Sequence, residues 1–501
     1  MRFGAVCFLL LSLAIGAPAD AVDLRMGSKG LPAVLGNPYT GNGSPGNFLW
    51  TAMFDGLTAL DKNGAISPAL ATSWKLVTPT SWQFTLRKGV AFSNGEPFNA
   101  KAVMATLAWI RMPEGARMVI GPEIRGIVGA EAVDDYTVTI STAKPDPILP
   151  ARLSGIMIVA PGAWAELGPD GFSQTPFGTG SFAVKDWGKG ARVTLEAFTN
   201  SWRRPKVDRL IIVNLPEDTS RVQALLSGQV DIAGNIGVDD IDTLEAAGML
   251  MAVGPGMAVT ALAFKTEGAR NPALKDPRVR QAINYAIDKD SLNKALLRGL
   301  APPAGQPASR GVNGYNPDVA AFPYDPAKAK ALLDEAGYGS GFPLRFDVMV
   351  DRFPADRGIY QTVQQSLAKI GVQMELHTIT VAAWLEAYNT GGWDKDTDGF
   401  LLSTNSAPYN DVARPLEIYS CLRPKAFFCD KGLTQKLVAA NEQIDADKRL
   451  AQLNELAKLY HDAAPMIYLN EQFDLFGVSR KLEGFALINR TPAYDKISVR
   501  K

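Results

Sequence analysis

Histidine, cysteine and net charge are scarce in this sequence. Its 501 residues include two histidines and three cysteines, and 51 basic side chains balance 51 acidic ones. The two histidines, His377 and His461, leave few groups for imidazole acid–base chemistry or metal binding. Without an excess of positive charge, the chain has no electrostatic means of holding a nucleic-acid backbone. Composition therefore disfavours a histidine-dependent enzyme and a DNA- or RNA-binding protein.

The usual catalytic and nucleotide-binding motifs are also missing. The chain contains no GxSxG, HExxH, EF-hand or P-loop pattern. A GxGxxG match at Gly41, Gly43 and Gly46 is preceded by Pro38 and contains Pro45, where a dinucleotide site needs an uninterrupted strand and helix. We therefore predict a protein that is not an enzyme, has no cofactor and performs no covalent step. A secreted hydrolase or a chaperone-like protein is the alternative from a different class.

The first 21 residues have the pattern of a secretory signal peptide. Arg2 precedes an apolar run over residues 3–15, and small residues follow at Ala19 and Ala21. Cleavage after Ala21 is favoured over cleavage after Ala19. The run is shorter than the roughly 20 apolar residues that a membrane span needs. The sequence therefore predicts an exported, periplasmic protein.

Two cysteines remain after export, because Cys7 lies inside the signal peptide. Cys421 and Cys429 flank a short loop in a compartment that is oxidising, which favours a disulfide. Zinc binding is the alternative, but no CxxC pair or nearby histidine completes a tetrahedral site.

Helix and strand patterns alternate along the chain, which is typical of an α/β protein. Apolar residues at strand spacing predict strands over 82–86, 136–140 and 372–376, and a continuous apolar run at 210–213 predicts a strand buried on both faces. Apolar residues at helical spacing, with capping residues at several ends, predict helices over 100–111, 219–227, 276–287, 325–337, 357–370 and 447–462.

The uncharged segment 246–264 is nearly long enough to span a bilayer. Gly254, Pro255 and Gly256 interrupt it. Because these residues break a helix, the segment predicts a strand, a turn and a second strand in a buried sheet.

Six segments along the chain carry glycine, proline and charged residues in a recognisable order. They are FSNGEPFNAKAV at 92–103, PFGTGSF at 176–182, NSWRRPKVD at 200–208, SGQVDI at 227–232, DPRVRQAINYAID at 276–288 and YDPAKAKALLDEAGY at 324–338. Together they resemble the bacterial extracellular solute-binding proteins of family 5. These are the large peptide-, opine- and nickel-binding components of ABC importers.

The resemblance implies a two-lobed α/β architecture of the periplasmic-binding-protein type II fold, with an extra third domain as in the large cluster C proteins. By analogy, lobe one combines residues 22–60, 175–260 and 470–501, the extra domain is 61–174, and lobe two is 261–469. The uncharged segment then lies at a crossover between lobes and acts as a hinge. The implied mechanism is closure of the lobes around a ligand, followed by docking of the closed monomer on the membrane permease.

The resemblance also places a ligand-proximal segment at residues 393–419. In peptide-binding relatives this segment has a Y-x-D-P-like turn, whose aspartate pairs with the α-ammonium group of the peptide. The nearest match is Tyr409, Asn410 and Asp411, followed by Val412 instead of proline. Asp411 is therefore predicted as an ammonium anchor, with a turn cap as its structural alternative.

Other side chains predicted to contact ligand are polar groups after an apolar strand, aromatic rings able to stack on a sugar, and residues of the loop 37–47. They are Tyr39, Asn42, Trp384, Trp393, Ser403, Thr404, Asn405 and Ser406. Short peptides are the first expectation, and a sugar-like or opine-like solute is the second. Nickel or haem carriage is third, because His377 and His461 have no neighbouring metal ligand in the sequence.

Overall fold

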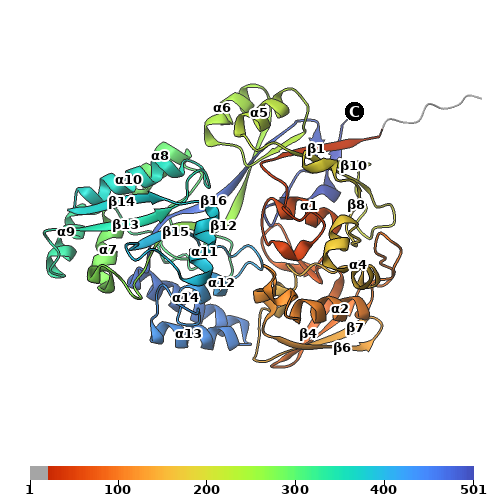
Figure 1. Cartoon of the computed structure of the whole chain (residues 1–501), viewed down its shortest axis with the longest axis horizontal. Helices are drawn as coiled ribbons and strands as arrows, with labels where there is room; N and C mark the ends of the chain where they lie inside the picture. Colours follow the sequence, from red (N-terminus) through yellow and green to blue (C-terminus); the bar gives the residue numbers. More distant parts are fainter. Residues whose placement is uncertain (1–20, 501) are drawn as a thin grey trace, which may run out of the picture.

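The computed structural model describes residues 21–500, so all but the last residue of the predicted signal peptide lies outside the described residues. Figure 1 shows two bodies side by side, one coloured red to yellow and the other green to blue. Two long strands, β12 and β16, run between them. This arrangement is the two-lobed α/β fold that the sequence predicts.

A ten-stranded sheet extends through both bodies. In the first body, β1 lies parallel to β10 and to β11. In the second, β13 lies parallel to β14 and to β15. The strands, in spatial order, are β14 (Val372–Thr378), β13 (Phe342–Val348), β15 (Gly399–Ser403), β12 (Leu250–Phe264), β16 (Met466–Val478), β11 (Ile232–Gly234), β1 (Asp23–Ser28), β10 (Arg209–Asn214), β9 (Arg192–Ala197) and β8 (Phe182–Asp186).

The strands β12 and β16 pair in an antiparallel ladder along most of their length. The predicted turn at Gly254–Gly256 is wrong, because β12 continues through it as one strand. The register shifts between Pro255 and Val259, and Met257 takes a left-handed φ of 50°. A proline without an N–H group and a glycine against the Gln472 backbone are accommodated in this irregularity.

A second, four-stranded antiparallel sheet lies at one end of the first body, at the lower right of Figure 1. Its order is β4 (Ala71–Thr78), β5 (Ser81–Leu86), β7 (Thr137–Thr142) and β6 (Ile127–Asp134). Two-stranded ladders join β2 (Thr58–Leu60) to β3 (Ile66–Pro68), β17 (Leu482–Glu483) to β20 (Ser498–Val499), and β18 (Leu487–Ile488) to β19 (Thr491–Pro492).

The helices cover both sheets. They are α1 (Gly46–Met53), α2 (Ala100–Arg111), α3 (Leu149–Arg152), α4 (Pro161–Gln174), α5 (Asp218–Leu226), α6 (Ile241–Ala246), α7 (Pro277–Tyr285), α8 (Lys289–Leu297), α9 (Pro326–Glu335), α10 (Asp356–Ala368), α11 (Val381–Thr390), α12 (Ala413–Ile418), α13 (Lys431–Glu442) and α14 (Ala446–Ala463). Each of the six predicted helices is confirmed. The predicted caps of α7 and α9 also form, since Asp276 accepts from the Arg278 N–H and Asp325 from the Lys328 N–H.

The predicted strands are confirmed as β5, β7, β14 and β10. Burial of β10 differs from the prediction. Leu210 and Ile212 are fully buried, whereas Ile211 and Val213 on the opposite face are only half-buried. An apolar run of four residues therefore marked a strand with one fully covered face.

Packing ties the four-stranded sheet to the first body. Leu24 of β1 and Phe84 of β5 belong to one continuous apolar core. In contrast, Val222 of α5 and Leu244 of α6 pack in the core of the second body. We propose the predicted boundaries as the domain division: 22–60, 175–260 and 470–501; 61–174; and 261–469. Within this division, α5 and α6 bridge the two lobes beside the crossing strands (Figure 1).

The family-like segments around residues 176–182 and 200–208 meet at one buried carboxylate. The Asp55 carboxylate accepts hydrogen bonds from the Thr179 hydroxyl at 2.8 Å, the Trp202 indole at 3.0 Å and the Arg203 Nε at 2.7 Å. Charge-assisted bonds of this kind are among the stronger ones in proteins. These segments therefore help to hold the first lobe together.

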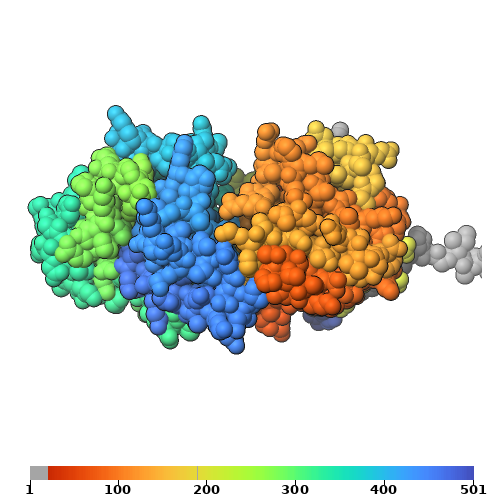
Figure 2. Space-filling view, turned by 90° about the horizontal axis from the view of Figure 1, so that it is seen from below, coloured from red at the N-terminus to blue at the C-terminus, as the bar shows by residue number. Residues whose placement is uncertain are grey.

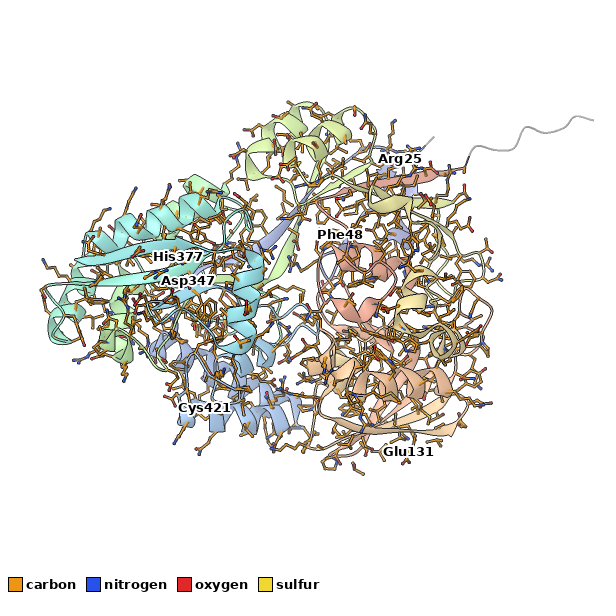
Figure 3. The ribbon with its side chains drawn as sticks, viewed as in Figure 1. Arg25, Phe48, Glu131, Asp347, His377 and Cys421 are labelled. Atoms are coloured by element: carbon orange, nitrogen blue, oxygen red, sulfur yellow. A yellow bond between two sulfur atoms is a disulfide. The ribbon has the colours of Figure 1, made fainter. Side chains whose placement is uncertain are left out.

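The predicted disulfide between Cys421 and Cys429 is formed, in the second lobe (Figure 3). It closes a loop with a sequence separation of 8 residues.

The double substitution of Cys421→Ala and Cys429→Ala is expected to lower the free energy of unfolding by about 2–3 kcal/mol, because the unfolded chain gains loop entropy. Urea unfolding of oxidised protein measures this. Reductant should lower the stability of the wild type and leave the double variant unchanged. Equal midpoints for the two oxidised proteins would contradict the prediction.

Candidate functional site

In each lobe the loops that follow the parallel strands carry charged residues. In open α/β sheets, ligands bind outside the carboxyl ends of the strands. β1 ends at Ser28 and is followed by Lys29, and β13 ends at Val348 shortly before Arg352. Partial burial, and then the nearby charges of Arg352 and Arg221, lower the pKa of Lys29. The charge of Arg352 in lobe two therefore acts on Lys29 of lobe one, and both side chains are exposed.

Carboxylates near this pair of cations are already bonded to other groups. Asp351 pairs with Arg357 at 2.8 Å. Asp356 accepts backbone N–H groups of residues 351–353, the shortest from Arg352 at 2.8 Å. Within residues 21–500, no carboxylate forms an ion pair with the Lys29 or Arg352 side chain. Asp218 and Asp356 act on Lys29 only through their charge, and raise its pKa.

A buried guanidinium organises the loops of lobe one. Arg221 of α5 is fully buried and donates to carbonyl oxygens of Leu215 and Pro216 after β10 and of Gly234 and Asn235 at the end of β11. Asp218 is its carboxylate partner. Arg221 therefore fixes the loops that follow two parallel strands, next to Lys29.

The predicted polar run begins at Ser403, the last residue of β15, and continues through Ser406. The Ser403 hydroxyl accepts from the Gln472 amide at 3.0 Å, and Gln472 also donates to Thr260 at 3.2 Å. The Thr404 hydroxyl is buried, donates to the Pro307 carbonyl at 2.6 Å and accepts from the Val259 N–H at 3.1 Å. Thr404 thus fastens the run to the hinge strand β12 and is not free to bind ligand.

Two further members of the run differ in their partners. The half-buried Asn405 side chain accepts from the Ala407 N–H at 2.9 Å, which is a local turn. The Ser406 hydroxyl is fully buried and has no hydrogen-bond partner within the described residues. Of the four, Ser403 and Asn405 are the more accessible, and Ser406 holds an unused hydroxyl.

Asp411 is bound within the protein. Its carboxylate makes a paired contact with the Arg449 guanidinium, with both N–O distances 2.8 Å. It also accepts from the Asn313 amide at 2.6 Å and from the Ala413 N–H at 2.9 Å, which is the predicted turn cap. Asp411 is 1% exposed. Arg449 therefore already neutralises the negative charge of Asp411 that an ammonium group of a ligand would need.

Asp411, Asn410 and Tyr409 line a pocket of about 360 Å³ between lobe two and the extra domain. Trp74, Trp82, Ile66 and Ile148 face them from the extra domain. Asn410 has a left-handed φ of 52° and donates to the carbonyl oxygens of Gly64 and Gly311, both at 2.9 Å. The predicted turn thus lies at a junction between domains.

The remaining predicted residues lie mostly in apolar packing. Tyr39 is 1% exposed, stacks on Trp109 and donates its hydroxyl to Met157. Trp393 stacks on Phe400 at 4.1 Å, and half-buried Trp384 donates to the Leu401 carbonyl and stacks on Tyr388. Asn42 is half-buried in the loop before α1. The ligand roles of the two tryptophans stay predictions.

The histidines do not form a catalytic or metal site. His377 Nδ1 lies 2.8 Å from the Asp347 carboxylate at the outer part of the lobe-two sheet (Figure 3). The Thr397 hydroxyl donates to Asp347 at 2.6 Å, so it is not aligned for activation by the imidazole as in a catalytic triad. His461 stacks on Phe322 and contacts the Gly305 carbonyl. Within residues 21–500, no group of three His, Cys, Asp or Glu side chains could hold a metal ion.

The fold defines a class of protein. Figure 2 shows a groove between the two bodies, bridged where the blue segments meet the orange ones. Two α/β lobes joined by paired crossing strands are the architecture of a hinged solute-binding protein. No helix within the described part of the chain is long and apolar enough to cross a bilayer.

Residues 65–413 match the family model described as "Bacterial extracellular solute-binding proteins, family 5 Middle", and the chain belongs to this family. The chain is 29% identical over 472 residues to the glutathione-binding protein GsiB of Pectobacterium atrosepticum, covering 91% of this chain and 90% of that one. It is 26% identical over 464 residues to di/tripeptide-binding protein 2 of Pseudomonas aeruginosa, covering 86% and 85%. It is thus a solute-binding protein of the kind that serves ABC importers, and the family consists of binding proteins and not enzymes.

Solved structures show the same fold. The Helicobacter pylori periplasmic binding protein DppA, in complex with the peptide STSA, superposes with a TM-score of 0.81 at 22% identity, covering 96% of this chain and 99% of that one. The Agrobacterium protein AgaA, in complex with agropinic acid, has a TM-score of 0.79 at 24% identity and the same coverage. The extra third domain is therefore part of a shared three-part architecture.

The sequence analysis missed Lys29 and Arg352. Each is a charged residue that follows a strand by a few positions, and this placement is the signal that could have identified them. The signal has meaning only when the strands are known to be parallel and to end at the same edge.

Proposed function

We propose that this protein captures a short peptide or peptide-like acid in the periplasm, closes around it and delivers it to the permease of an ABC importer. The glutathione- and di/tripeptide-binding relatives support a peptide-like ligand. The crossing strands β12 and β16 provide the hinge. The mature protein is exported after cleavage of its signal peptide and acts as a monomer.

The observation that carries this proposal is the two-lobed fold joined by β12 and β16, with the exposed cations Lys29 and Arg352 on opposite lobes. A ligand carboxylate between them neutralises two like charges whose repulsion otherwise opposes approach of the lobes. The closed form therefore gains more from ligand than the open form does. This differential affinity is the requirement for ligand-driven closure.

Lys29→Ala and Arg352→Ala are each expected to weaken ligand binding by about 10- to 100-fold, the loss of one charge-assisted hydrogen bond. Isothermal titration with a dipeptide, with glutathione and with a C-terminally amidated dipeptide measures this. The matched control is Lys369→Ala, which removes an exposed cation from lobe two, the lobe of Arg352. It should leave affinity unchanged. Equal binding of the free and amidated dipeptides would contradict the role of the two cations.

A sugar-like or opine-like solute is the second candidate. The observation that favours it is the Asp411 carboxylate, which Arg449 already neutralises, so that a free ammonium group has no evident partner there. A thermal-shift screen of peptides, opines and oligosaccharides on the mature chain separates the candidates, because a ligand that binds the native state raises the melting temperature. Turnover of a bound compound would instead support the hydrolase alternative.

A further inference from the structure

The extra domain meets lobe two through a charged seam. Arg414 of lobe two bonds Glu123 of the extra domain, with both nitrogen–oxygen distances 2.9 Å. Arg152 of the extra domain reaches Glu417 of lobe two at 3.8 Å, and Arg125 reaches the same carboxylate at 3.7 Å. The side chains of Arg414 and Glu123 are only 18% and 10% exposed. Lys144 of the extra domain also pairs with Glu442 of lobe two at 2.8 Å. Three guanidinium groups, one ammonium group and three carboxylates therefore join two domains that must separate for ligand exchange.

Apolar and polar contacts complete the seam. Ile148 and Ala151 of the extra domain pack with Tyr409 and Ala413 of lobe two in a small apolar cluster. The Arg152 guanidinium lies 4.7 Å from the centre of the Tyr409 ring. The Asn410 amide described above crosses the same junction to the Gly64 carbonyl. The two domains therefore meet in a close-packed contact in which the polar groups have defined partners.

Energetics make such a seam reversible. Two charges buried against each other gain Coulomb energy but lose hydration, so the net stabilisation of a complete pair is small. Leaving one partner buried alone is costly. A misaligned closed form is therefore disfavoured, because it leaves charges buried without partners. Because the correctly paired seam adds little net stabilisation, ligand binding still controls the equilibrium between the open and closed forms.

Arg414 also connects the seam to the 403–406 loop. Besides Glu123, its guanidinium donates to the Asn405 carbonyl at 2.7 Å. Asn405 belongs to the polar run that follows β15. A single side chain thus bonds Glu123 of the extra domain on one side and the 403–406 loop on the other.

We propose that the Glu123–Arg414 pair is an interdomain latch, through which the extra domain holds lobe two in the closed position and sets the geometry of the 403–406 loop. This proposal rests on the hinge closure of the proposed function. In it, Arg414 is a positioning residue and makes no contact with solute. The extra domain then has a role in closing, in addition to enlarging the first lobe.

The latch can be tested without any ligand. Spin labels are placed on exposed sites of the two bodies, at Glu131→Cys on β6 and Lys458→Cys on α14, and double electron–electron resonance gives the distance distribution. Arg414→Glu and, separately, Glu123→Arg are expected to lower the population at the short distance by about tenfold or more, which corresponds to roughly 1.4 kcal/mol. The double exchange of both residues should recover part of that population, with Arg152 and Glu417 limiting the recovery.

The control is Lys436→Glu, which reverses a charge in an ion pair with Glu455 inside lobe two. It should leave the distance distribution unchanged. Thermal unfolding of each variant separates opening from loss of folding. Unchanged distributions in both single variants, or no recovery in the exchanged pair, would overturn the latch. Because no ligand is present, these results are independent of whether the protein binds peptides.

Discussion

Replacing Arg449 by methionine is expected to lower the free energy of unfolding by about 3–5 kcal/mol, since it leaves the Asp411 carboxylate buried without its counter-charge. The Arg449 and Asp411 side chains are 5% and 1% exposed, so water cannot hydrate the carboxylate in place of the guanidinium group. Urea unfolding at pH 7, followed by circular dichroism, gives the change.

The matched control is Lys448→Met, the preceding residue on α14, whose side chain is 72% exposed. Its effect should stay within about 0.5 kcal/mol. The double variant Asp411→Leu with Arg449→Met should be more stable than Arg449→Met alone, because it removes the buried charge. A double variant as unstable as the single one would show that the ion pair is not the cause.

The same double variant tests Asp411 as the predicted ammonium anchor. If Asp411 serves only the fold, the folded double variant binds a dipeptide as the wild type does. If Asp411 pairs with the ligand α-ammonium group, affinity falls by about tenfold or more. Titration at a temperature where both proteins are fully folded distinguishes the two roles.

The second large effect is expected at Lys289, at the start of α8. Its side chain is buried, with the Nζ atom 3.1 Å from the Asn284 amide oxygen and 5.5 Å from the centre of the Phe322 ring. Burial lowers the pKa of Lys289 to about 7. The unfolded chain therefore binds more protons than the folded chain between about pH 7 and the ordinary lysine value of 10.5. Stability from this group rises with pH across that window, and the cost of burying the charge is complete below it.

Lys289→Met is expected to remove this pH dependence. The gain in the free energy of unfolding is of the order of a few kcal/mol at pH 6, reduced by about 1–3 kcal/mol because the Asn284 oxygen loses its donor. The gain should shrink as pH rises toward 10. Lys294→Met, on the exposed face of α8, is the control and should leave the pH profile unchanged. Wild type and Lys289→Met profiles that run parallel from pH 6 to 9 would contradict the buried-charge explanation.

Local patterns predicted most elements of this protein because local physics decides them. The caps at Asp276 and Asp325, the alternation in β5 and β14, and the short loop between Cys421 and Cys429 each depend on residues close in sequence. The six ordered segments identified the family, which the match over residues 65–413 supports. Their side chains, as around Asp55, hold the scaffold and do not name the ligand.

Long-range pairing decided the rest. The sequence by itself determined an α/β chain with its helices, strands, disulfide and family, because periodicity and capping act over a few residues. The tertiary structure decided that Arg449 neutralises Asp411, that Tyr39 is core, and that β12 passes unbroken through Gly254–Gly256. It also brought Glu123 against Arg414. These contacts join residues tens to hundreds of positions apart, and their energies depend on burial and charge neighbours that exist only after the lobes have folded and met.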